Sequence, residues 1–298
     1  MRVEWPTLAL IVASYGLLGI GLFGLPAISV GLAVLFLIPV IALQSSLQHE
    51  VLHGHPFERR WMGETLVFVS FNLCVPYLRF RDTHLAHHHD ANLTDPYDDP
   101  ESNYLDPAVW ARLPFWQRGL LNANNTLLGR IVLGPAIGQL SFMAADWRAI
   151  RMGDRAVLTG WLWHIPVTAV LLALVIASPL PVWAYLLACY GGMGVLKIRT
   201  FLEHQAHTRA SGRTAVIEDR GPLAFLFLNN NLHVVHHMHP RLPWYRLPGL
   251  YRAHRDRFLT RNGGYVYASY GQVARQYFWR AKEPVPHPLY PAAHDRQN

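Results

Sequence analysis

Four long apolar runs dominate the pattern of hydrophobic and polar positions. They comprise residues 7–23, 27–47, 157–177 and 182–198. Lys197 is the only charged residue within them. A helix rises about 1.5 Å per residue and a bilayer core is about 30 Å thick, so roughly 17 to 25 residues can cross it. Because only residues 24–26 and 178–181 separate the members of each pair, the pattern predicts an all-α integral membrane protein with four transmembrane helices in two hairpins.

Two shorter apolar runs are broken by residues that disturb helices. Residues 66–78 contain Asn72 and Pro76, and residues 131–144 contain Gly134 and Pro135. Such runs fit interfacial or re-entrant helices better than full spans. A buried helix in the polar part of the chain is an equally good alternative.

The distribution of Lys and Arg predicts the orientation of the chain in the membrane. All 26 Lys and Arg residues lie at the N-terminus, in residues 48–156 or from Lys197 onward, and neither hairpin tip has one. The positive-inside rule places residues 48–156 and 199–298 in the cytoplasm, where they form a helical cap on the spans. The net charge of +7 is therefore an orientation signal, and no nucleic-acid partner is expected. Residues 1–298 are expected to form a single domain.

The 17 histidines are the second unusual feature. Only His164 lies inside a predicted span, and most of the others form clusters on the cytoplasmic side. The clusters are His49 and His53; His84, His87 and His88; His204 and His207; and His233, His236 and His237. Positions i, i+3 and i+4 of a helix share one face, so each cluster directs its imidazoles toward one point.

This clustering predicts a metal centre. Neutral imidazole is a good ligand for iron, copper, nickel or zinc, and eight or more imidazoles exceed the needs of one ion, so two metals are expected. The second span is predicted to continue as helix through His53. The fourth is predicted to run on past Lys197 and present His204 about 10 Å beyond the membrane boundary. Two cysteines within apolar runs, Cys74 and Cys189, offer no thiolate metal site.

The three larger clusters resemble the histidine boxes of the membrane fatty acid desaturase and hydroxylase superfamily. The family pattern is HxxxH, HxxHH and a distant HxxHH, matched here by residues 49–53, 84–88 and 233–237. The segment Phe201-Leu202-Glu203-His204 resembles the place where desaturases carry a further iron ligand, which favours His204 over His207. The resemblance extends from the first span to residues 242–248.

The resemblance implies a non-haem di-iron centre that uses O2 to convert a methylene pair of an acyl chain into a carbon–carbon double bond. The implied iron ligands are His49, His53, His84, His87, His88, His204, His233, His236 and His237. His207, Glu50 and Asn230 are possible further ligands or hydrogen-bond partners of the ligands. No catalytic residue beyond the metal centre and no organic cofactor is expected.

The oxidation also requires electrons from another protein. The sequence has no haem-binding His-Pro-Gly-Gly segment, no cysteine set for an iron–sulfur cluster and no dinucleotide-binding glycine motif. The expected donor is a ferredoxin or a cytochrome-b5-like protein with its reductase. The substrate is expected to be a fatty acyl lipid or thioester. Arginine outnumbers lysine by 24 to 2, which favours a GC-rich bacterial genome and hence the bacterial inner membrane. The positive-inside rule places the active site on the cytoplasmic side.

Acidic residues beside the boxes are candidates to orient the ligands, because metal-bound histidines usually donate their second N–H to a carboxylate or carbonyl. Glu50 and Glu203 are two such candidates. For residues 95–101, a solvated loop is the preferred interpretation, since its prolines mark turns.

Several alternatives remain open. Residues 49–53 also read H-E-x-x-H, the signature of a zinc protease, in which Glu50 would be the general base; that interpretation leaves the two HxxHH boxes unexplained. A carboxylate-bridged di-iron bundle needs two Glu-x-x-His motifs and two further glutamates; only Glu50 to His53 fits, so this alternative fails. Within the superfamily, a carotenoid or lipid hydroxylase or ketolase, or a desaturase of a small acyl-like metabolite, is the main alternative to a fatty acyl desaturase.

Overall fold

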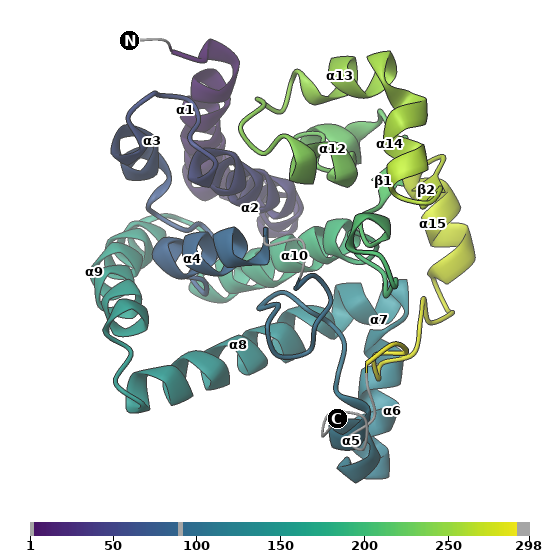
Figure 1. Ribbon diagram of the computed structural model, residues 1–298. Helices are drawn as coiled ribbons and strands as arrows, with labels where there is room; N and C mark the ends of the chain where they lie inside the picture. Colours follow the sequence, from purple (N-terminus) through teal and green to yellow (C-terminus); the bar gives the residue numbers. More distant parts are fainter. Residues whose placement is uncertain (1–2, 89–91, 291–298) are drawn as a thin grey trace.

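The computed structural model describes residues 3–88 and 92–290 (Figure 1). His89 and Asp90, which adjoin the second histidine box, lie outside these ranges. In chain order the helices are α1 (Trp5–Gly19), α2 (Val30–Leu52), α3 (Arg60–Val67), α4 (Tyr77–His87), α5 (Pro107–Arg112), α6 (Phe115–Asn124), α7 (Leu127–Val132), α8 (Gly134–Arg151), α9 (Arg155–Ala177), α10 (Val182–Thr200), α11 (Pro222–Leu226), α12 (His233–Met238), α13 (Leu247–Ala253), α14 (Arg255–Arg261) and α15 (Tyr270–Tyr277). The strands β1 (Val216–Ile217) and β2 (Val266–Tyr267) pair in parallel.

Within residues 3–88 and 92–290, three helical segments are long and apolar enough to cross a membrane: Trp5–Ala27, Val30–Leu52 and Arg155–Ala177. The first hairpin turns later than predicted. The residues expected to break the helix, 24–26, continue it as a π-helical turn followed by a 3-10 turn that ends at Ala27. The chain reverses at Ser29, whose side chain caps α2 by accepting a hydrogen bond from Leu32 N at 3.3 Å. A short polar side chain that accepts from the first free N–H groups is the usual start of a helix.

The fourth predicted span forms helix α10, but it is less apolar than the other three. Its glycines allow α2 to approach closely: a Cβ at Gly191 would lie 2.7 Å from Ile38 Cδ1, and one at Gly192 would lie 2.9 Å from Ile41 Cγ2. Small residues let helices pack backbone to backbone in membranes. The same glycines, together with Lys197 near the C-terminal end, lower the mean hydropathy of α10. The count of four spans and their orientation therefore stay predictions.

Residues 68–76 form an irregular segment packed into the bundle, so the prediction of a helix over residues 66–78 is wrong. Helix α3 ends at Val67 and α4 begins at Tyr77. Phe71 and Asn72 are buried, and Leu73 adopts a left-handed conformation with φ 61°. Side chains of the surrounding helices form hydrogen bonds with the backbone of residues 68–76. Gln44 Nε2 donates to Val69 O at 2.8 Å, Tyr185 OH donates to Phe71 O at 2.7 Å, and His164 Nε2 lies 3.0 Å from Leu73 O.

Those bonds explain why an irregular segment is tolerated beside apolar helices. Non-helical backbone at membrane depth persists only where protein groups satisfy its N–H and C=O groups. By contrast, residues 131–144 form the end of α7 and much of α8. Leu140, Met143 and Trp147 of α8 are exposed, as expected of an interfacial helix and not of a buried core helix.

Helices α11 to α15 and the two short strands form the cap that holds the third histidine box. In Figure 1, α13, α14 and the strands surround α12 on the side away from α9. Val234 and Val235 of α12 are buried against Leu247, Tyr251 and Phe258. Because these valines face the core of the cap, the histidines of the same short helix are directed to its other side.

Candidate metal centre

The histidines lie at the ends of four segments that converge. Helix α2 runs to Leu52 with His53 as its C-cap, as predicted. Helix α4 ends at His87 with His88 as its C-cap, and α12 begins at His233. His204 follows α10 but is not helical, because α10 ends at Thr200. His204 instead lies in an isolated β-bridge with Thr214, so the prediction that the helix continues to it is wrong.

The structure brings the nine predicted ligand histidines into two groups. Within each group, the candidate ligand atoms all lie within 4.8 Å of one another. The first group consists of His49, His53, His84, His88 and His236, and the second of His87, His204, His233 and His237. Each group therefore combines different boxes, and the second and third boxes contribute to both.

Distances within the groups match ligands of a transition metal. In the first group, His88 Nε2 lies 3.0 Å from His84 Nε2 and 3.1 Å from His236 Nε2. In the second, His204 Nε2 lies 2.8 Å from His87 Nε2 and 3.0 Å from His233 Nε2. Two imidazole nitrogens about 2.1 Å from one ion and at right angles around it stand roughly 3 Å apart. The donor geometry therefore fits one ion per group.

Two further nitrogens of the first group support the same assignment. His49 Nε2 and His53 Nε2 are buried and have no hydrogen-bond partner within the described part of the chain. A buried polar atom without a partner costs free energy, so native proteins rarely leave one unsatisfied. A metal ion bound to the first group would satisfy both nitrogens.

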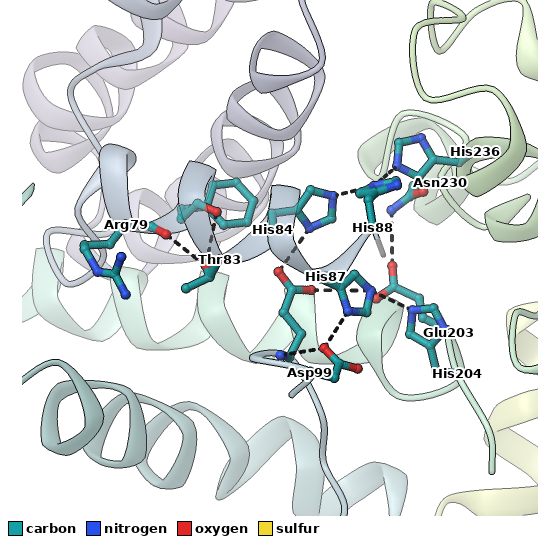
Figure 2. Close-up of polar contacts among 12 residues, drawn as sticks. Arg79, Thr83, His84, His87, His88, Asp99, Glu203, His204, Asn230 and His236 are labelled. Carbon is teal, nitrogen blue, oxygen red and sulfur yellow. Dashed lines mark hydrogen bonds and ion pairs between the residues drawn. The ribbon is translucent and has the colours of Figure 1, made fainter. Parts of the chain in front are cut away.

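Carboxylates and an amide hold the opposite edges of three rings, and Figure 2 shows this arrangement for Asp99 and His87. His87 Nδ1 lies 2.8 Å from Asp99 Oδ1, and His84 Nδ1 lies 3.0 Å from Glu101 Oε1. His233 Nδ1 lies 3.1 Å from Asn230 Oδ1. Such contacts fix the ring orientation and leave Nε2 directed at the metal position.

Glu203 is a further carboxylate beside the histidines, and it contacts Asn230. Its Oε1 accepts a hydrogen bond from Asn230 Nδ2 at 3.1 Å and lies 3.1 Å from Arg199 Nε. Arg199, at the end of α10, was not singled out by the sequence, because nothing local distinguishes it from the other arginines. Asn230 therefore lies between Glu203 and His233, at the start of the third box.

Burial determines the protonation state of several histidines in both groups. It lowers the pKa of His53, His204, His233 and His236, and the neighbouring imidazoles lower it further in each case. Neutral imidazole has a free lone pair, so these residues are ready to bind a metal at neutral pH.

His87 differs from the other histidines of the second group. Burial opposes its protonation, but Glu101 and the hydrogen-bonded Asp99 outweigh burial and raise the pKa of His87 to about 9. Burial likewise acts to raise the pKa of Glu101, but His84 and His87 prevail and lower it below its ordinary value. In the metal-free site, His87 therefore carries a proton that a bound metal must displace.

The interpretation of residues 95–101 as a solvated loop is wrong at two positions. Asp99 is buried and contacts His87, and Glu101 contacts His84. Asp95, by contrast, caps its own turn by accepting from Tyr97 N and Asp98 N. An acidic run shortly after a metal-binding box was the available signal, but the sequence did not indicate which carboxylates turn inward.

Two of the possible further site residues lie outside both groups. His207 Nδ1 accepts a hydrogen bond from Arg209 N at 3.0 Å, and His207 is not a member of either group. Glu50 Oε1 accepts from Trp244 N at 2.8 Å and lies 3.8 Å from His55 Nε2. Glu50 thus links the first box to the loop that follows the third.

A comparison with protein-family models gives one match over most of the chain. The model described as fatty acid desaturase matches residues 6–269. A comparison with curated proteins gives no match. The matched range contains all nine histidines of the two groups.

Proposed function

Because the chain belongs to the fatty acid desaturase family, we propose that it is an O2-dependent fatty acyl desaturase with one non-haem iron in each histidine group. The observation that carries the proposal is the convergence of nine imidazoles into two groups with the spacing of ligands around one ion. Sites built from histidine alone suit iron and other borderline metals. Iron is the metal on which this family typically depends.

When bound, the two irons would supply the redox chemistry that activates O2. The overall change is balanced when a –CH2–CH2– pair, O2, two electrons and two protons give –CH=CH– and two waters. The acyl chain and the external donor each contribute two electrons to the reduction of O2. The donor is proposed to be a ferredoxin or a cytochrome-b5-like protein with its reductase, docking on the arginine-rich cytoplasmic side.

The residues of this chain hold the ligands in place and exclude water. Asp99, Glu101 and Asn230 fix three rings through Nδ1, so that little reorganisation is needed when the metals bind. His49, His84 and His233 are almost completely buried. Restricted access of water to such a centre suits an oxidation that must act on an unactivated methylene pair and not on solvent.

The contacts of Glu50 argue against the zinc-protease alternative. A general base must reach a metal-bound water, whereas the Glu50 carboxylate accepts from Trp244 N and faces His55. A zinc site of that class also needs three protein ligands, far fewer than nine. The substrate is proposed to be an acyl lipid or thioester that reaches the centre from the bacterial inner membrane.

Expression in a bacterial host with suitable electron donors, followed by mass analysis of its lipids, tests the proposal. Loss of two hydrogens from an acyl chain is the expected result, whereas gain of one oxygen would indicate a hydroxylase. His87→Ala should abolish the product while the protein stays in the membrane. A purified protein with one zinc and no iron would refute the di-iron assignment.

A further inference from the structure

The residues that follow α15 contact the chain between α4 and α7 and the segment that carries His204, a member of the second histidine group. We call residues 282–287 the C-terminal strap. Its backbone is bound at both ends and in the middle. Lys282 N donates to Asn125 O at 3.2 Å, Leu105 N donates to Val285 O at 3.0 Å, and His287 N donates to Leu105 O at 2.8 Å. The strap therefore binds the segment between α4 and α7, which carries Asp99 and Glu101.

Lys282 connects the strap to His204. Its side chain is only 10% exposed, and its ammonium group donates to the backbone carbonyl of His204. The same Nζ lies 3.5 Å from Phe201 O and 3.4 Å from Glu283 Oε2. An ammonium group has three N–H donors, so these three acceptors satisfy it. A buried cation at this position holds the non-helical segment that presents His204.

Glu283 strengthens this attachment through Tyr104. The Tyr104 hydroxyl donates to the Glu283 carboxylate and accepts a hydrogen bond from Ala206 N at 2.9 Å. The backbone is thus held both at His204 and two residues beyond it. Because α10 ends at Thr200, no helical hydrogen bonds fix this segment, and the strap supplies other constraints.

His287 reaches the second group by a separate route. His287 Nε2 lies 3.2 Å from Thr94 Oγ1, Thr94 N donates to Asp99 Oδ2 at 2.9 Å, and Asp99 Oδ1 contacts His87. Thr94 has φ 70°, a left-handed conformation that is strained for a β-branched residue. The contact with His287 helps to keep Thr94 in the conformation that directs its N–H at Asp99.

We propose that the C-terminal strap is a positioning element for the second histidine group, acting on His204 through Lys282 and on His87 through His287. This inference rests on the proposed function in one respect, namely that the second group binds a metal. Lys282 and His287 do not themselves touch the metal position. They are positioning residues, and their loss should weaken metal retention in one group more than in the other.

The test measures the release of iron into a colorimetric chelator from the full-length protein in detergent. Lys282→Met removes the ammonium group, and Arg280→Met is the matched control, because Arg280 lies two residues away and is exposed. His287→Phe tests the second route and keeps the ring that packs against Tyr104. Lys282→Arg restores a cationic donor.

Wild-type protein and Arg280→Met should hold two irons and release them slowly. Lys282→Met and His287→Phe should release about half of their iron at least about tenfold faster, as is typical when a partner of a ligand is removed. Lys282→Arg should release iron more slowly than Lys282→Met. Circular dichroism of each variant checks that the helical fold is kept.

Release at the wild-type rate from both Lys282→Met and His287→Phe would overturn the proposal. Equal acceleration for both irons would also overturn it, since general destabilisation acts on both groups. Failure of the desaturase assignment is a separate result. Wild-type protein that holds two irons but forms no lipid product would refute the proposed function without contradicting the role proposed for the strap. If the wild type takes up zinc in place of iron, the same release comparison is made with zinc.

Discussion

Asp99→Asn separates the two effects of one carboxylate on the second histidine group. Asp99 is 5% exposed. Its Oδ1 lies 2.8 Å from His87 Nδ1, and its Oδ2 accepts from Thr94 N at 2.9 Å. Asparagine has the same shape but lacks the charge. The substitution should therefore weaken the orientation of His87 and lower its pKa, with opposite consequences for metal binding.

The magnitudes follow from the proton on His87. Its pKa is raised to about 9 by Glu101 and Asp99 against the effect of burial. Below that pH a metal must displace the proton, so affinity rises as pH rises, by about tenfold per unit. Between pH 7 and 9 the gain is about a hundredfold, or about 2.7 kcal/mol. At pH 9, where this proton no longer limits binding, loss of the charged partner should weaken the affinity about 10- to 100-fold.

Titration of the metal-free protein with Fe²⁺ under anaerobic conditions, at several pH values from 7 to 9, measures both effects. Asp99→Asn should show lower affinity of the second site at pH 9 and a shallower rise of affinity with pH. Asp98→Asn is the control, because Asp98 carries the same charge one residue away and is exposed. An unchanged affinity at pH 9 together with an unchanged slope would refute the role assigned to Asp99.

Three further predictions concern ligands and buried contacts. His204→Ala should reduce bound iron from two atoms to one, whereas His207→Ala should retain both, because only His204 belongs to a histidine group; metal analysis of the purified variants decides between these outcomes. Asp146→Ala leaves the Arg79 guanidinium, 2.9 Å from the carboxylate, without its partner, and should lower the free energy of unfolding by about 3–5 kcal/mol in denaturant titration. Gln44→Leu should lower it by about 1–3 kcal/mol for each unpaired backbone group of the segment 68–76, measured in the same way. Unchanged denaturation midpoints would contradict the last two predictions.

The sequence determined the parts of this protein that depend on local composition. Apolar runs of spanning length predicted helices α2, α9 and α10 with close to their observed bounds. The boxes identified eight of the nine histidines of the two groups, because spacings of three and four residues place side chains on one helix face. The ninth, His204, was identified by the resemblance of residues 201–204 to a desaturase segment. Both signals are contained within a few turns of helix, so they needed no knowledge of what packs against that helix.

Tertiary structure decided how the histidines divide. His87 and His88 are adjacent in sequence but belong to different groups. The partner of His87 is His204, 117 residues away, and the partner of His88 is His236, 148 residues away. A helix face defines a direction, whereas membership in a group depends on which other faces meet there.

The same reason explains the expectations that the structure corrected. Residues 68–76 are irregular because Gln44, Tyr185 and other distant side chains satisfy their backbone, which no local pattern could indicate. Asp99 is a buried partner of His87 and Asp98 is exposed, although both stand in one acidic run. The sequence alone determined which groups can bind a metal, since that depends on side-chain chemistry. Only the packing of distant segments decided which of them share an ion and which carboxylates orient them, because burial and hydrogen bonding are properties of the assembled chain.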